Sequence, residues 1–180
     1  MAFTTDGGDG PPRSLLIAAI AVAVAAVIAV LVFAAVRQLP EQLQPVPIVP
    51  VPAPQADSPQ CAALMAALPD QLGDYRRAVV DTTATGVAAW QTAPDAEPVI
   101  LRCGLDRPAE FVVGAPLQVV DPVQWFELTD AGRSTWFAVD RPVYIALTLP
   151  TGSGPTPIQE ISEAISKAMP AKPLAPGKPR

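Results

Sequence analysis

Hydrophobic and polar residues divide this chain into a long apolar segment, a proline-rich stretch and a region of shorter alternating patterns. The apolar segment, Leu15 to Val36, contains 22 residues without a charge, an amide or a hydroxyl group. As a helix that rises about 1.5 Å per residue it is about 33 Å long, which matches a hydrocarbon core of about 30 Å. Arg13 and Arg37 flank the segment, where long basic side chains can reach the membrane interface. The pattern predicts a transmembrane helix over residues 15–36 with the lipid bilayer as its partner.

The apolar segment is too long for the core of a signal peptide, which spans about 7–15 residues. The preceding residues 1–14 carry Asp6 and Asp9 against a single arginine, whereas a signal peptide begins with a basic region. Val32-Phe33-Ala34 is a weak match to a small-residue cleavage site, which leaves partial processing as an alternative. We expect an uncleaved single-pass anchor, with residues 1–14 in the cytoplasm.

Proline dominates the stretch that follows the apolar segment. Seven prolines lie in the 20 residues from Pro40 to Pro59, and proline removes backbone donors and fixes φ. We therefore expect residues 37–57 to form an extended polyproline-II spacer, at most about 60 Å long. The last residues, 171–180, combine three prolines and three cations without periodicity and predict a disordered basic tail. A single folded domain over residues 58–170 remains.

Two helices are indicated within residues 58–170. Ser58-Pro59 is typical of an N-cap followed by the first helical position, and Pro69 ends the helix that it opens. Thr156 to Gln159 has the pattern of a capping box, with Pro157 at the first helical position. Helical spacing of apolar residues supports both helices. These apolar positions are Cys61, Leu64, Met65 and Leu68 in the first helix, and Ile158, Ile161 and Ile165 in the second.

The sequence between the two helices alternates as strands do. Val143 to Leu149 has apolar residues at every second position. In Val99 to Cys103 the cysteine shares one face with valine and leucine, and Arg102 faces the other way. The remaining predicted strands are Gly86 to Gln91, Leu117 to Val120 and Ser134 to Val139. Together these patterns predict an α+β fold: an antiparallel sheet with two helices on one face, preceded by one transmembrane helix and a Pro-rich linker.

The two cysteines, Cys61 and Cys103, fall on core-facing sides of a predicted helix and a predicted strand. A disulfide between them would close a loop of 43 residues and contribute about 4 kcal/mol by loop-closure entropy. Two buried free thiols are the alternative. Cysteines at complementary positions behind a membrane segment favour the disulfide, and disulfides persist outside the cytoplasm. We therefore expect a C-terminal domain that is extracytoplasmic.

Composition removes several kinds of chemistry. The 180-residue chain contains no histidine and two cysteines, and its net charge is -5. Imidazole bases and imidazole ligands are therefore absent, and two thiols cannot complete a four-cysteine zinc site or an iron–sulfur site. A nucleic-acid-binding surface needs a basic face. We expect no metal, no cofactor and no nucleic-acid partner.

One tripeptide occurs twice, as Asp106-Arg107-Pro108 and as Asp140-Arg141-Pro142. A turn or bulge explains each copy, because proline inside a sheet is confined to edges and bulges. The alternative is a pair of Asp–Arg forks that present a ligand or partner surface, with Asp106, Arg107, Asp140 and Arg141 as its residues. The spacing of the other carboxylates singles out no pair, so no catalytic residue is assigned.

Several motifs of the folded region resemble those of a known family. The chain is similar to the actinobacterial family of membrane-anchored proteins known as domain of unknown function 3515, in which Cys61 occupies the place of a partner cysteine. The resemblance implies a location at the cell membrane, and it implies no reaction, ligand or partner. The matching residues are Trp90, Arg102-Cys103-Gly104, Pro108, Trp125, Asp140-Arg141, Val143-Tyr144 and Pro150.

These observations predict a single-pass membrane protein whose extracytoplasmic domain acts as a binding or accessory module in the cell envelope. Another envelope protein or a cell-wall polymer is the expected partner. The alternative is a hydrolase-like envelope enzyme that uses carboxylate or serine residues. A deep pocket with convergent polar groups would favour the enzyme, and a shallow surface would favour the binding module.

Overall fold

The computed structural model describes residues 13–37, 43–130 and 132–179. The chain divides into two compact units, Met1–Glu41 and Gln42–Arg180. Most of the predicted cytoplasmic segment, residues 1–12, and residues 38–42 of the predicted linker lie outside the described residues.

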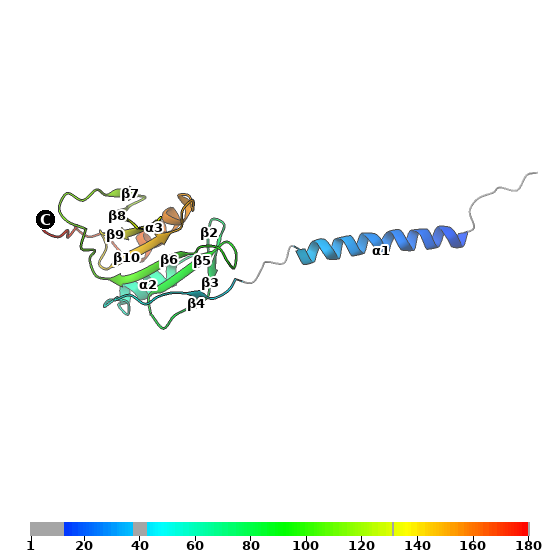
Figure 1. Ribbon diagram of the computed structural model, residues 1–180, viewed down its shortest axis with the longest axis horizontal. Helices are drawn as coiled ribbons and strands as arrows, with labels where there is room; N and C mark the ends of the chain where they lie inside the picture. The colour runs from blue at the N-terminus through cyan, green and yellow to red at the C-terminus, as the bar shows by residue number, and fades with distance from the viewer. Residues whose placement is uncertain (1–12, 38–42, 131, 180) are drawn as a thin grey trace, which may run out of the picture. The chain divides into compact units, whose positions relative to one another are not determined.

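The first unit contains a single described helix, α1 (Arg13–Arg37), as the apolar segment predicts (Figure 1). Its side chains are exposed from Ser14 to Ala35, and that part is long and apolar enough to cross a membrane. A helix without an apolar stripe has no preferred face to bury in a protein core. Membrane anchors and N-terminal signal sequences share this length and composition.

The second unit is built on a large antiparallel sheet, which confirms the predicted mixed α+β class (Figure 1). The described residues form eight strands in the order β2-β3-β5-β6-β10-β9-β8-β7. Every predicted strand is present, and β8 is one that the sequence patterns did not indicate. The bounds are β2 Gln71–Leu72, β3 Tyr75–Ala78, β5 Val87–Gln91, β6 Val99–Leu105, β7 Gln118–Val120, β8 Val123–Asp130, β9 Arg133–Ala138 and β10 Tyr144–Leu149.

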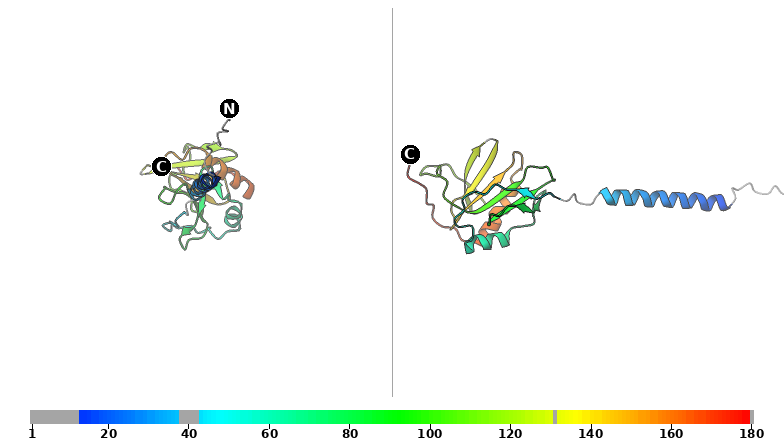
Figure 2. Two further views of the ribbon diagram at one scale, coloured as in Figure 1. Left: turned by 90° about the vertical axis from the view of Figure 1, so that its right-hand side faces the viewer. Right: turned by 60° about the horizontal axis from the view of Figure 1, so that its bottom comes forward.

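Two helices accompany the sheet, α2 (Pro59–Ala67) and α3 (Thr156–Ala168). They lie side by side in the right-hand view of Figure 2. The Ser58 N-cap is confirmed, because its Oγ accepts a hydrogen bond from the Cys61 N–H at 3.3 Å. The predicted capping box at the beginning of α3 is wrong. The Gln159 N–H donates to the Pro155 carbonyl at 3.2 Å, so Pro155 is the N-cap, without a side-chain hydrogen bond, and Thr156 already belongs to the helix.

The main core joins both helices to alternate residues of the central strands. Trp90 and Trp125 are fully buried there, and their indole N–H groups donate to the Pro69 carbonyl and to Ser162 Oγ, both at 3.0 Å. The predicted disulfide is confirmed in the same cluster, with 5.7 Å between the Cα atoms of Cys61 and Cys103. It ties α2 to β6. Other members of this core include Leu64, Leu101, Ile145, Leu147, Ile161 and Ile165.

The proline-rich stretch corrects the sequence prediction, because from residue 43 onward it packs on the domain. A two-residue strand, β1 (Val46–Pro47), pairs in parallel with β4 (Val80–Asp81). Val46 and Ile48 are buried, and their N–H groups donate to the carbonyls of Val79 and Asp81. Prolines at alternate positions explain why the strand forms: they face away from the ladder, where no donor is needed. The prediction of an extended spacer over residues 37–57 is therefore wrong for residues 43–57.

Gly104 anchors the same stretch farther along. The Gln55 N–H donates to the Gly104 carbonyl at 3.0 Å. Gly104 has a φ of +88°, and a Cβ atom built there would lie 2.3 Å from the backbone nitrogen of Ala56. A side chain at this position is therefore excluded both by backbone conformation and by space.

The C-terminal residues are also ordered, so the prediction of a disordered tail is wrong for residues 171–179. The Lys172 N–H donates to the Asp140 carbonyl at 2.8 Å. The Gly177 N–H donates to the Phe111 carbonyl at 2.8 Å, and the Gly177 carbonyl accepts from the Val113 N–H at 3.0 Å. Backbone hydrogen bonds thus hold a segment whose composition alone indicates no structure.

We expect a chain of residues 58–170 to be much less stable than a chain of residues 42–180. Removing Val46 and Ile48 exposes the sheet surface that they cover, at a cost of about 1.5–3 kcal/mol for each buried side chain. Urea unfolding should show a loss of at least about 3 kcal/mol. A chain of residues 42–170 separates the contribution of the C-terminal segment. Equal urea midpoints for the longest and shortest chains would contradict the prediction.

Candidate functional site

The structure buries one of the two Asp–Arg pairs that the sequence offered as a ligand surface. Asp140 and Arg141 are each 2% exposed. Arg141 Nη1 forms an ion pair with Asp140 Oδ2 at 2.8 Å, and Nη2 donates to the Pro122 carbonyl at 2.9 Å and to Ser166 Oγ at 3.4 Å. The pair therefore joins the turns before β8 and β10 to α3. The alternative of a ligand fork at these two residues is corrected to an internal structural link.

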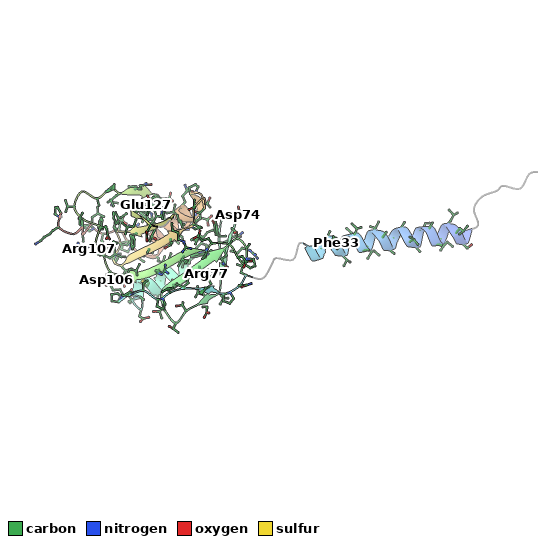
Figure 3. All side chains as sticks on the ribbon, in the orientation of Figure 1. Phe33, Asp74, Arg77, Asp106, Arg107 and Glu127 are labelled. Carbon is green, nitrogen blue, oxygen red and sulfur yellow. A yellow bond between two sulfur atoms is a disulfide. The ribbon has the colours of Figure 1, made fainter. Side chains whose placement is uncertain are left out.

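Asp106 and Arg107 are exposed on the turn that follows β6, at one end of the domain in Figure 3. Arg107 lies against the C-terminal segment, because a Cβ atom at Gly177 would be 2.9 Å from Arg107 Nη1. Burial raises the pKa of Tyr144, and the Arg107 charge partly opposes that rise. Among the described residues, no hydrogen bond or ion pair joins this pair to Asp140 or Arg141. The four predicted residues therefore do not form one site.

A groove crosses the sheet on the side away from the disulfide. It has a volume of about 450 Å³ and is lined by β6, β9, β10 and the segment that follows β1. Arg102 lines it from β6, opposite Ala146 of β10, and Ala146 in turn lies opposite Phe137 of β9. The small alanine leaves room above the sheet between the two larger side chains. Asp106 also lines the groove, so one of the predicted residues belongs to it.

Two apolar clusters explain why the groove stays open. Val46 and Ile48 cover Ala89 and Ile100 toward one side of the sheet. Phe111 packs on Phe126 and Val139 toward the other side, with 5.6 Å between the two phenylalanine ring centroids. Between these covers, the face carries Thr135 and Thr148, whose hydroxyls are 3.1 Å apart, and the alanine and arginine described above. The groove is the strip that neither segment covers.

Arg102 is the unusual residue of this groove. Its Nε atom is buried without a hydrogen-bond partner. No hydrogen bond or ion pair joins its guanidinium to another residue that the structure describes. Burial lowers the pKa of the Arg102 guanidinium, yet an arginine in a protein stays protonated. A half-buried cation without a counterion favours an anion beside it, because the unpaired donors are partly removed from water.

Three consecutive residues of β6 build the site and fix its surroundings. Cys103 points into the core and bonds α2, while Arg102 points into the groove on the other face. Gly104 admits the backbone that leads to the groove wall formed by Val51 and Pro52. Strand alternation in the sequence already places the side chains of Arg102 and Cys103 on opposite faces of the sheet. The sequence does not show that other segments cover the sheet on both sides of Arg102, and this cover leaves the arginine in a groove instead of on an open face.

Among the residues that the structure describes, no three side chains of the kinds that ligate metals converge. The family model described as Protein of unknown function (DUF3515) matches residues 20–174 of the chain. No curated protein and no solved structure matches it. The match covers the domain, the Pro-rich stretch and most of the apolar helix, and its description states no reaction or ligand.

Proposed function

This chain belongs to the DUF3515 family, and on that premise we propose that it is a membrane-anchored binding module whose Arg102 groove takes an anionic group. The unpartnered guanidinium is the observation that carries the proposal. Guanidinium groups pair with carboxylates and phosphates through two parallel hydrogen bonds. The apolar walls beside Arg102 would strengthen such a pair by excluding water.

The groove supports binding more than catalysis. Its lining holds one cation, one exposed carboxylate and two threonine hydroxyls. Hydrolysis by a serine or carboxylate needs an adjacent base or acid within hydrogen-bond reach, and the described lining offers no such pair. We therefore favour the binding module over the envelope hydrolase.

We also infer that α2 and α3 cover the same face of the sheet, because both contribute to the cluster that contains Cys103 and Leu101. The groove then occupies the opposite face, which no helix among the described residues of the domain covers. A site on rigid strands keeps its side chains in place without a ligand.

For the location of the domain, we infer that α1 is retained as a bilayer anchor and that the domain lies outside the cytoplasm. The length of α1 and its exposed apolar surface support the anchor. The disulfide supports the compartment, because disulfides are rare where glutathione keeps thiols reduced. An envelope protein or a cell-wall polymer that carries carboxylate or phosphate groups fits the groove by charge.

The test is a titration of a chain of residues 42–180 with acetate and with inorganic phosphate, in which backbone amide chemical shifts measured by NMR report binding. In the wild-type chain we expect saturable shifts in β6, β9 and β10 around Arg102. Arg102→Gln should weaken binding by about 10-fold or more, because hydrogen bonds to charged groups contribute about 1.5–3 kcal/mol. Arg102→Lys keeps the charge without the planar fork, so its affinity for the anion should lie between those of the wild-type chain and Arg102→Gln.

Arg107→Gln is the matched control, because it removes an exposed guanidinium from the same end of the domain while leaving the groove lining intact. Its affinity should equal that of the wild-type chain. Shifts that are absent in the wild-type chain, or unchanged in Arg102→Gln, would overturn the proposed function.

A further inference from the structure

We propose a second binding site, for a neutral oligosaccharide, in the cleft where the sheet meets the beginning of α3. Two adjoining cavities of about 420 and 290 Å³ form this cleft. They share Trp136, Leu149 and Gly154, so they are continuous along one wall. The walls come from β7, β9 and β10 on one side and from α3 and the loop before it on the other.

Trp136 differs from the other two tryptophans. Trp90 and Trp125 are fully buried and their indole N–H groups are hydrogen-bonded. Trp136 is half-buried, packs on the edge of the main core, and lines both cavities. No hydrogen bond from its indole N–H to another described residue is present. A flat apolar ring with a free donor at its edge suits a pyranose ring, which has an apolar C–H face bordered by hydroxyl groups.

The polar lining of the cleft indicates a neutral ligand. Gln118 and Gln159 contribute exposed side-chain amides from β7 and α3, and Asp121 contributes a carboxylate. Amide and carboxylate groups present the paired donors and acceptors that neighbouring hydroxyls require. No lysine or arginine lines either cavity among the described residues, so an anion has no partner there. The second cavity adds the hydroxyls of Ser134, Thr151 and Ser153.

One residue of the cleft, Asp121, has an uncommon backbone conformation. Asp121 has a φ of +50°, although it precedes a proline, a position that normally takes an extended conformation. Its exposed carboxylate makes no hydrogen bond or ion pair with another described residue. Conformations of this kind persist where the surrounding structure holds them, often beside a ligand. Gly154 has a φ of +71° and open space where a Cβ atom would lie, which leaves the rim of the cleft uncovered.

This site is independent of the Arg102 groove. Trp136 and Phe137 are neighbours on β9, so their side chains point to opposite faces of the sheet. Phe137 lines the groove and Trp136 lines the cleft. Loss of anion binding at Arg102 would therefore leave the cleft intact, and failure of one proposal does not decide the other.

The test is a tryptophan-emission titration of the full chain in micelles of dodecyldimethylamine oxide, a detergent without a sugar headgroup. Tetrasaccharides of N-acetylglucosamine, glucose and mannose are the probes, and calorimetry follows any probe that leaves the emission unchanged. Because Trp90 and Trp125 are buried, a saturable change in emission reports Trp136. We expect saturable binding of at least one tetrasaccharide and much weaker binding of its monosaccharide.

Gln118→Ala and Gln159→Ala should each weaken that binding by about 3- to 10-fold, the usual effect of one lost neutral hydrogen bond. Both side chains are exposed, so these variants should fold. A Trp136→Ala variant is a less suitable test, because it removes a side chain that packs on the main core. Gln124→Ala is the matched control, because Gln124 lies between two core-facing residues of β8 and therefore faces the opposite side of the sheet. No saturable binding of any tetrasaccharide by either measurement, or equal affinity in all three glutamine variants, would overturn the proposal.

Discussion

Replacing Cys61 and Cys103 together with alanine should lower the free energy of unfolding by about 2–5 kcal/mol, the usual cost of removing a disulfide from a small extracellular domain. The bond joins α2 to β6 across the main core, and both cysteines are completely buried. Without the bond, the unfolded chain regains the entropy of an open loop, and α2 is held by packing alone. A domain of ordinary stability, about 5–15 kcal/mol, would lose a large share of it.

Urea unfolding of the oxidised, chemically reduced and Cys61→Ala/Cys103→Ala chains measures this effect. The reduced chain and the double variant should have similar midpoints, well below that of the oxidised chain. The difference in midpoint between the reduced chain and the double variant measures the small effect of removing the two sulfur atoms. Mass spectrometry that finds two free thiols in chain purified from cells without reductant would contradict the disulfide and, with it, the proposed location outside the cytoplasm.

The elements that could be predicted from sequence are those whose signals are local. Ser58-Pro59 marks the beginning of α2 because the cap and the proline act within one helical turn. Val143 to Leu149 alternates cleanly because β10 is central and its core face is fully buried. β8 escaped prediction because its apolar and polar positions alternate only up to Trp125. Phe126 next to it is also buried, against Phe111 on the other face.

The remaining features depend on contacts between distant residues. The proline-rich composition predicts a spacer that includes Val46 and Ile48, and only the partner strand β4 shows why these two residues are buried. Arg102 became a candidate site residue because two separate segments cover the sheet on either side of it. The tail is ordered by backbone hydrogen bonds to Phe111 and Val113, which leave no trace in composition. Local patterns predict elements, but they do not predict which surfaces those elements leave open.

The buried Asp140–Arg141 pair leads to the other large expected effect. Asp140→Asn should destabilise the domain by about 3–5 kcal/mol, because it leaves a guanidinium buried without a counterion. The substitution keeps the size of the side chain, so a cavity does not explain the loss. The remaining bonds of Arg141, to the carbonyls of Asp140 and Pro122 and to Ser166 Oγ, are made to neutral groups.

A double-mutant cycle tests whether the charge is responsible. Replacing a whole buried ion pair by uncharged groups is often close to neutral, whereas removing one partner is not. Asp140→Asn/Arg141→Met should therefore recover stability relative to Asp140→Asn, and urea unfolding at neutral pH should show a coupling of at least about 1 kcal/mol. Arg107→Gln, which removes an exposed arginine of the same repeated tripeptide, should change the midpoint little. A loss below about 1 kcal/mol for Asp140→Asn would show that the pair is hydrated and belongs to an accessible surface after all.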